Sequence, residues 1–173
     1  MKLNQRCEAI RLLLSDVDGV MTNGGLIFNN EGIETKVFHV RDGTGFKVWH
    51  RAGYQSGLVT ARTSHVVQLR ASELGIEIVR QGVQDKRAAI CQIAESLGFE
   101  PQAVCYIGDD LADIAAIREV GLGVAVADAA EEVRRVADYT TSLPGGSGAV
   151  REVIEVVLKN QRRWDDLMQK FGA

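Results

Sequence analysis

Residues 12–19, Leu12-Leu13-Leu14-Ser15-Asp16-Val17-Asp18-Gly19, join an apolar run to two aspartates and a glycine. A short apolar run of this kind is typical of a strand that is buried on both faces. Because residues i and i+2 of an extended backbone point to the same side, we expect Asp16 and Asp18 to lie together at the end of that strand. Two carboxylates at close range repel each other unless a cation such as Mg²⁺ lies between them. The stretch therefore predicts a central strand and a metal-dependent site, although two aspartates can also simply end a strand and begin a turn.

The rest of the chain alternates short apolar runs with longer amphipathic segments. Besides residues 12–15, the predicted strands are 57–60, 77–79, 103–107 and 122–126. Helical spacing of apolar residues predicts helices over 43–52, 64–74, 86–97, 111–120 and 130–136. Strands and helices that alternate in this way predict an α/β fold, a Rossmann-like parallel sheet with helices on both faces. We expect all 173 residues to form one domain.

Two segments depart from this alternation. Residues 24–41 contain two extended arms, Leu26–Asn29 and Lys36–Val40, with a turn around residues 30–32 between them. This pattern predicts a β-hairpin that projects after the first strand. Residues 145–173 form a C-terminal tail, in which a glycine-rich stretch precedes a predicted final helix over residues 148–170.

A second acidic group follows the predicted strand over residues 103–107. Asp109 is expected at the strand end, Asp110 near a helix N-terminus and Asp113 one turn further along. Helix capping by acidic residues explains one of these carboxylates well but three of them poorly. Because parallel strands end at the same edge of a sheet, this group is expected near Asp16.

Thr60 and Lys86 complete the set at that edge. Thr60 ends a predicted strand and has a hydroxyl that can donate to a phosphoryl oxygen, while Lys86 begins a predicted helix and can neutralise charge there. Taken singly, each residue is more simply explained as a turn threonine or a solvated lysine. Four features that meet at one edge favour a common site instead.

Composition excludes several classes of partner. A formal net charge of -3 argues against nucleic acid or an anionic membrane as the main partner. The three cysteines are widely spaced and suggest neither a disulfide framework nor a zinc site. The N-terminal residues lack the uninterrupted apolar region of a signal peptide, and no run of 18 apolar residues occurs, so we expect a cytoplasmic protein.

The ordered set of Asp16-Val17-Asp18, Thr60, Lys86 and Asp109 to Asp113 resembles the four motifs of the haloacid dehalogenase superfamily. The resemblance implies that Asp16 attacks phosphorus and that Asp18 serves as general acid and base. It implies Mg²⁺ bound by Asp16, the backbone carbonyl of Asp18, and Asp109.

The same resemblance implies supporting roles for the remaining members of the set. Thr60 and Lys86 would bind the phosphoryl oxygens. Asp113 would orient Lys86 or a metal-bound water, and Asp110 would assist. The presence of Asp18 argues against dehalogenation.

Finer features resemble one family within this superfamily, the 3-deoxy-D-manno-octulosonate 8-phosphate phosphatases. They are the first aspartate motif, the hairpin, Val40-Arg41-Asp42-Gly43, and Gly145-Gly146-Ser147-Gly148 with the residues that follow it. The resemblance implies a capless homotetramer that hydrolyses a phosphorylated eight-carbon sugar acid in lipopolysaccharide precursor synthesis. Hairpins and tails of neighbouring subunits would complete each site.

The arginines are candidates for binding the sugar acid. Arg62 is the first of them, since related phosphatases for a nine-carbon sugar acid tend to have an acidic residue there, and a guanidinium binds a carboxylate well. Arg41 and Arg151 are weaker candidates, and each of the three could instead be solvated or ion-paired. Ala61 replaces the glycine that is common in the family.

Three alternatives remain open. A phosphatase for a nine-carbon sugar acid 9-phosphate is the main rival, and a catalytically silent tetramerisation domain is another. A phosphorylatable signalling receiver also gathers acidic residues, a threonine and a lysine, but it lacks the spacing of Asp16 and Asp18 after the first strand.

Overall fold

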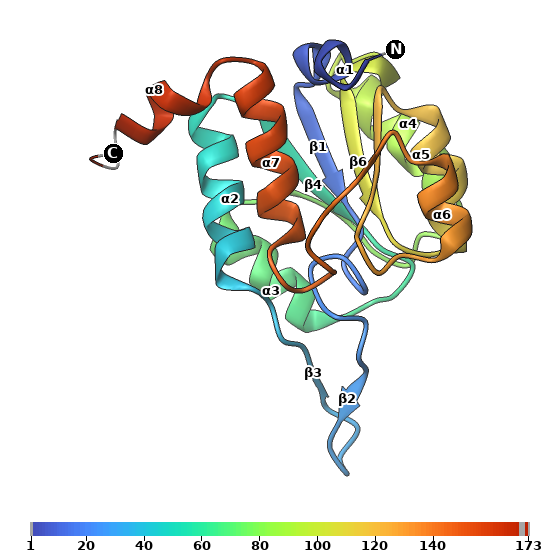
Figure 1. Ribbon diagram of the computed structural model, residues 1–173. Helices are drawn as coiled ribbons and strands as arrows, with labels where there is room; N and C mark the ends of the chain where they lie inside the picture. The colour runs from blue at the N-terminus through green and yellow to red at the C-terminus, as the bar shows by residue number, and fades with distance from the viewer. Residues whose placement is uncertain (1, 170–171, 173) are drawn as a thin grey trace.

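The computed structural model describes residues 2–169 and Gly172, and a parallel sheet forms its centre (Figure 1). Its strands are β1 (Leu12–Ser15), β4 (Gln55–Val59), β5 (Ile78–Arg80), β6 (Val104–Gly108), β7 (Leu122–Ala125) and β8 (Tyr139–Thr140). They lie in the order β5-β4-β1-β6-β7-β8, and every neighbouring pair is parallel. All residues of β1, β6 and β7 are buried, which explains why these strands are continuous apolar runs in the sequence. The predicted Rossmann-like sheet is confirmed.

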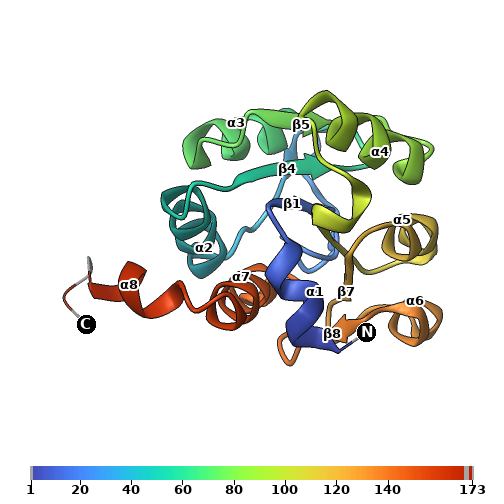
Figure 2. The ribbon, with the colours of Figure 1, turned by 90° about the horizontal axis from the view of Figure 1, so that it is seen from above.

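Helices cover both faces of this sheet, as Figure 2 shows from above. On one face lie α2 (Val40–Arg51), α3 (His65–Leu74) and α7 (Ala149–Asn160). On the other face lie α4 (Lys86–Ser96), α5 (Ile114–Glu119) and α6 (Glu131–Val136). Short 3₁₀ turns, η1 (Pro101–Ala103) and η2 (Leu111–Asp113), precede β6 and α5. Among the described residues, no helix is both long and apolar enough to cross a membrane.

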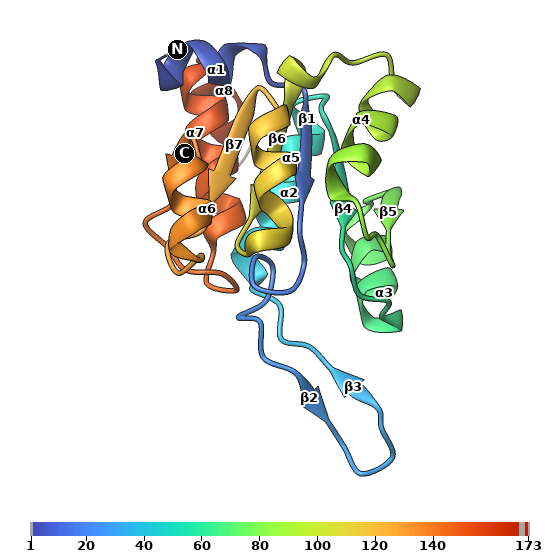
Figure 3. The same cartoon turned by 90° about the vertical axis from the view of Figure 1, so that its right-hand side faces the viewer.

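The predicted hairpin is present and projects beyond the carboxyl edge of the sheet (Figure 3). It pairs β2 (Ile27–Phe28) with β3 (Glu34–Thr35) in antiparallel register. The Asn29 side chain accepts hydrogen bonds from two backbone N–H groups of the turn, which fixes the tip. The first predicted arm, Leu26–Asn29, is longer than β2. The second, Lys36–Val40, was placed too late, since β3 ends at Thr35 and α2 already begins at Val40. Only this hairpin and α2 lie between Asp18 and β4, so this interval contains no cap domain.

Two predictions near the chain ends need correction. Helix α1 (Leu3–Ala9) was not predicted, and it packs against α7. The single helix predicted over residues 148–170 is two helices, α7 and α8 (Trp164–Gln169). Arg162 between them has a φ of 57°, a left-handed conformation that ends a helix. Residues 170, 171 and 173 of the predicted tail lie outside the described residues.

Candidate active site

The predicted site residues of the four motifs converge at the carboxyl edge of the sheet. Asp16 follows β1, Thr60 follows β4 and Asp109 follows β6, and β1 pairs with both β4 and β6. Lys86 is the first residue of α4. Open α/β sheets bind their ligands at this position, where neighbouring connections leave the sheet in opposite directions. A pocket of about 320 Å³ lies here, and its lining consists of Asp16, Asp18, Gly24, Leu26, Thr60, Ala61, Arg62, Lys86, Asp109, Asp110 and Ala112.

Lys86 joins two of the carboxylates inside the protein. Its side chain is only 4% exposed, and its Nζ lies 2.7 Å from Asp16 Oδ2 and 2.6 Å from Asp113 Oδ1. Burial alone would lower the pKa of Lys86, but these two carboxylates outweigh burial and raise that pKa above its ordinary value. Lys86 is therefore a fixed positive charge beside Asp16.

Asp113 is the hydrogen-bond centre beneath the pocket. Its fully buried carboxylate accepts from Lys86 Nζ and Tyr106 OH at Oδ1, both at 2.6 Å. Its Oδ2 accepts from the backbone N–H groups of Asp109 and Asp110 at 2.9 and 3.1 Å. Since both oxygens already accept two hydrogen bonds, Asp113 is suited to orienting Lys86, as the sequence suggested, and it also holds the Asp109 loop, which was not predicted.

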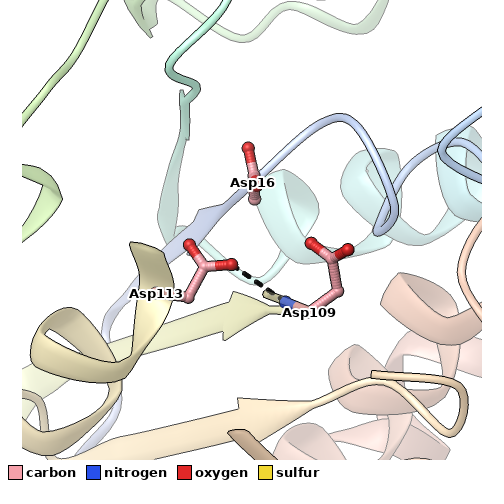
Figure 4. A group of neighbouring side chains, drawn as sticks. All are labelled: Asp16, Asp109 and Asp113. Carbon is pink, nitrogen blue, oxygen red and sulfur yellow. Dashed lines mark hydrogen bonds between the residues drawn. The ribbon is translucent and has the colours of Figure 1, made fainter. Parts of the chain in front are cut away.

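Carboxylate oxygens of Asp16, Asp109 and Asp113 lie within 4.8 Å of one another (Figure 4). Burial raises the pKa of Asp16 to about 6, against the opposing charge of Lys86. Burial and then repulsion from Asp16 and Asp113 raise the pKa of Asp109 to about 7. Asp109 Oδ1 is buried and has no hydrogen-bond partner.

This donor set fits Mg²⁺, which prefers carboxylate oxygens and relieves such repulsion. Since Asp113 is already saturated with hydrogen bonds, Asp16 and Asp109 are the side chains best placed to hold the ion. The part predicted for the Asp18 backbone carbonyl stays a prediction.

The Asp18 carboxylate and the Asp16 carboxylate contact different residues. Lys36 Nζ donates to Asp18 Oδ1, and Arg62 Nε lies 3.8 Å from Asp18 Oδ2. Both cations also contact Glu34 of β3, with Arg62 Nη2 at 2.8 Å and Lys36 Nζ at 3.1 Å. The hairpin thus contributes charged side chains directly to the pocket rim.

The remaining pocket residues lie where the sequence places them. Thr60 is 2% exposed, and its hydroxyl oxygen accepts from the backbone N–H of Arg62. Its hydroxyl proton is free to point into the pocket. Asp110 caps η2 by accepting from the Leu111 N–H, so capping explains this residue, which also lines the pocket.

Arg41 and Arg151 are not brought together with Asp16 within this chain. They line a separate pocket of about 610 Å³ between the first turns of α2 and α7. Arg151 pairs with Glu155 at 2.8 Å and lies over the ring of Trp164. Their predicted contact with the sugar acid stays a prediction.

Sequence reasoning missed Tyr106, Glu34 and Lys36 as members of the site. Tyr106 is in the apolar run of β6, and a buried tyrosine hydroxyl requires a partner, which is a signal that could have been used. Glu34 and Lys36 are two residues apart in an extended arm and so share one side of it. Their spacing indicated a common direction but not which residues they would contact.

Comparison with known proteins agrees with this geometry. Residues 50–154 match the family model of haloacid dehalogenase-like hydrolases. The 3-deoxy-D-manno-octulosonate 8-phosphate phosphatase KdsC of Yersinia pestis is 43% identical over 157 residues, which cover 91% of this chain and 84% of that protein. The protein of the same name from Escherichia coli K12 is 41% identical over 161 residues, covering 93% and 86%.

The solved structures agree as well. A crystal structure of 3-deoxy-D-manno-octulosonate 8-phosphate phosphatase from Moraxella catarrhalis, in complex with a magnesium ion, a phosphate ion and a KDO molecule, is similar with a TM-score of 0.96. It is 43% identical, and the match covers 98% of this chain and 97% of that one. From its motifs, its fold and these relatives, the chain belongs to the haloacid dehalogenase-like hydrolase family.

Proposed function

We propose that this chain is a Mg²⁺-dependent phosphatase that hydrolyses 3-deoxy-D-manno-octulosonate 8-phosphate to the free sugar acid and phosphate. The observation that carries the proposal is the contact of Asp16 with Lys86 at 2.7 Å in one pocket with Thr60 and Asp109. Relatives at 41% and 43% identity bear that activity in their names. The reaction belongs to the synthesis of lipopolysaccharide precursors.

The chemistry takes two displacements at phosphorus. In the first, Asp16 forms a bond to phosphorus while the bond to the sugar oxygen breaks, and Asp18 gives that oxygen a proton. In the second, Asp18 takes a proton from water, the water oxygen bonds to phosphorus, and the acyl phosphate bond breaks to restore Asp16. Lys86 and Thr60 bind the phosphoryl oxygens, on which charge accumulates.

Mg²⁺, held by Asp16, Asp109 and the carbonyl of Asp18, offsets the repulsion between the attacking carboxylate and the phosphate dianion. Asp113 keeps Lys86 in place through the contact at 2.6 Å. The elevated pKa values of Asp16 and Asp109 support the binding of a cation, since their carboxylates lie in buried surroundings with too little positive charge.

Arg62 supports the eight-carbon sugar acid over the nine-carbon rival. It lines the pocket beside Thr60, and 39% of its side chain is exposed, so that a substrate carboxylate can reach it. Both rival sugar acids have this carboxylate, so what favours the eight-carbon acid is that related phosphatases for the nine-carbon acid tend to have an acidic residue in place of Arg62. No described feature of the pocket favours the longer substrate.

The hairpin supports the proposal of a homotetramer. Its apolar side chains Leu26, Ile27, Phe28, Ile33 and Val37 are each at least 50% exposed. An apolar surface of this kind on a projecting element is typical of a subunit interface. In such an assembly Arg41 and Arg151 would contribute to the site of a neighbouring subunit, and we place the enzyme in the cytoplasm, where its three free cysteines stay reduced.

The proposal is tested by phosphate release from a panel of phosphorylated sugars and sugar acids, with Mg²⁺ and with EDTA. Metal-dependent release concentrated on 3-deoxy-D-manno-octulosonate 8-phosphate is expected. Equal turnover of the nine-carbon acid would remove the substrate assignment, and no release from any ester would favour a silent tetramerisation domain. Light scattering tests the tetramer, and a monomer at micromolar concentration would contradict it.

A further inference from the structure

Four charged side chains of alternating sign form a closed ring at the pocket rim. Asp18 contacts Lys36, Lys36 contacts Glu34 at 3.1 Å, Glu34 contacts Arg62 at 2.8 Å, and Arg62 Nε returns to Asp18 at 3.8 Å. Two members come from the loops after β1 and β4, and two come from the hairpin. The ring therefore joins the hairpin to the two strand ends at which the candidate chemistry takes place.

Glu34 makes the largest number of contacts in this ring. Its carboxylate accepts from Arg62 and Lys36 and also from the hydroxyl of Ser64, which precedes α3. Its side chain is only 13% exposed. The Ser64 hydroxyl, followed by Arg62 and Lys36, lowers the pKa of Glu34 to about 2. Glu34 is therefore a permanent anion that is held from three directions.

Arg62 depends on Glu34 for a defined position. Arg62 has a long side chain at an exposed rim. Its Nη2 forms an ion pair with Glu34, and its Nε is buried without a hydrogen-bond partner. A guanidinium has five N–H donors in a rigid fork, so one contact to Glu34 leaves donors for a second carboxylate. Because Lys36 also contacts the Glu34 carboxylate, Glu34 has two positively charged partners, Lys36 and Arg62.

We infer that Glu34 is a positioning residue for substrate selection, which holds the Arg62 guanidinium at the pocket rim in the orientation that binds the carboxylate of the sugar acid. The inference rests on the proposed function, because it requires a substrate with a carboxylate. It gives the hairpin a role within its own subunit. Glu34 does not itself touch the substrate.

The test is Glu34→Gln, which keeps the size of the side chain and removes its charge. The kinetics are measured with 3-deoxy-D-manno-octulosonate 8-phosphate and with p-nitrophenyl phosphate, which has no carboxylate. We expect KM for the sugar acid phosphate to rise about tenfold, the loss of one hydrogen bond to a charged group, while kcat stays within about twofold. Both constants for p-nitrophenyl phosphate should stay within about twofold.

Two further variants separate positioning from folding. Glu31→Gln makes the same change at the exposed hairpin tip and should leave both substrates unaffected. Ser64→Ala removes one of the three donors to Glu34, and since Ser64 makes no side-chain capping bond to α3, the helix start is preserved. It should raise KM for the sugar acid phosphate in the same direction, by a smaller factor.

Equal losses on both substrates in Glu34→Gln would overturn the inference and indicate a general structural role. An unchanged KM for the sugar acid phosphate would overturn it as well. The wild-type enzyme tests the proposed function separately: if it shows no preference for the sugar acid phosphate over other phosphorylated sugars, the substrate assignment fails, and carboxylate selection by Arg62 and Glu34 fails with it.

Discussion

Replacing Asp113 by asparagine should lower the free energy of unfolding by much more than the loss of one surface charge would. The carboxylate accepts four hydrogen bonds, from Lys86, Tyr106 and two backbone N–H groups, and its side chain is fully buried. An asparagine amide offers one oxygen that accepts and one NH₂ group that only donates. Whichever way the amide is turned, its NH₂ group faces at least one donor that it cannot satisfy.

The magnitude follows from which donors lose their acceptor. If the NH₂ group faces the two backbone N–H groups, both are left unsatisfied at a cost of about 1–3 kcal/mol each. If it faces Tyr106 and Lys86, the tyrosine hydroxyl can turn to accept, but the Lys86 ammonium retains only Asp16. Removing one negative charge near Asp16 and Asp109 offsets part of this cost. We expect the free energy of unfolding to fall by about 3 kcal/mol, equivalent to roughly 6–12 °C in Tm for a chain of this size.

The assay is urea unfolding of the metal-free protein at pH 7.5, followed by circular dichroism. Asp110→Asn is the matched control, because Asp110 is exposed and its carboxylate accepts only from backbone N–H groups of the turn that it caps. Tyr106→Phe tests one arm of the network alone and should cost about 1 kcal/mol. A loss below about 1 kcal/mol in Asp113→Asn, or one equal to that of Asp110→Asn, would refute the reasoning.

Three further predictions concern the metal site and the hairpin. Burial raises the pKa of Asp109 from its ordinary value of 3.8 to about 7, so the metal-free folded protein binds an extra proton between these pH values. The free energy of unfolding of the metal-free protein should therefore fall as pH rises through this window. Calorimetry at pH 6 should show that Mg²⁺ binding releases protons, and that Asp109→Asn releases fewer. Equal proton release by both proteins would contradict the role of Asp109 as a ligand. Gly19→Ala should weaken Mg²⁺ binding, because its Cβ would lie 1.9 Å from Asp109 Oδ2, whereas Gly32→Ala, with a similar φ and nothing within 4 Å, should bind Mg²⁺ as the wild type does. Phe28→Asp should shift the proposed tetramer to smaller species in light scattering, since Phe28 is 54% exposed on the hairpin. An unchanged mass would contradict an interface at the hairpin.

Much of the fold could be predicted because parallel strands buried on both faces have a strong sequence pattern. β1 was predicted over the same four residues, 12–15, that it occupies. The start of α2 was placed too late, since Gly43 and Gly45 weaken the helical pattern of its first turns. The helix can begin at Val40 because Gly45 packs against Arg151 and Ile154 of α7, a long-range contact with no local signal.

The site was predictable in part for a similar reason. Asp16, Thr60 and Asp109 follow strands, so sheet topology alone brings them together. The contacts of Glu34 and Lys36 could not be derived in this way, because the direction of a projecting hairpin depends on tertiary packing. The pairs that link Glu34 to Arg62 and Ser64 are 28 and 30 residues apart.

The most direct test of the account is to locate the phosphorylated residue during turnover. The enzyme is mixed with Mg²⁺ and 3-deoxy-D-manno-octulosonate 8-phosphate and quenched with borohydride, which reduces an acyl phosphate to an alcohol. Peptide mass spectrometry then identifies the modified side chain. We predict homoserine at position 16 only, dependent on both substrate and Mg²⁺ and absent in Asp16→Asn. Reduction at Asp18 or Asp109 instead, or turnover by Asp16→Asn at a rate near that of the wild type, would contradict the account.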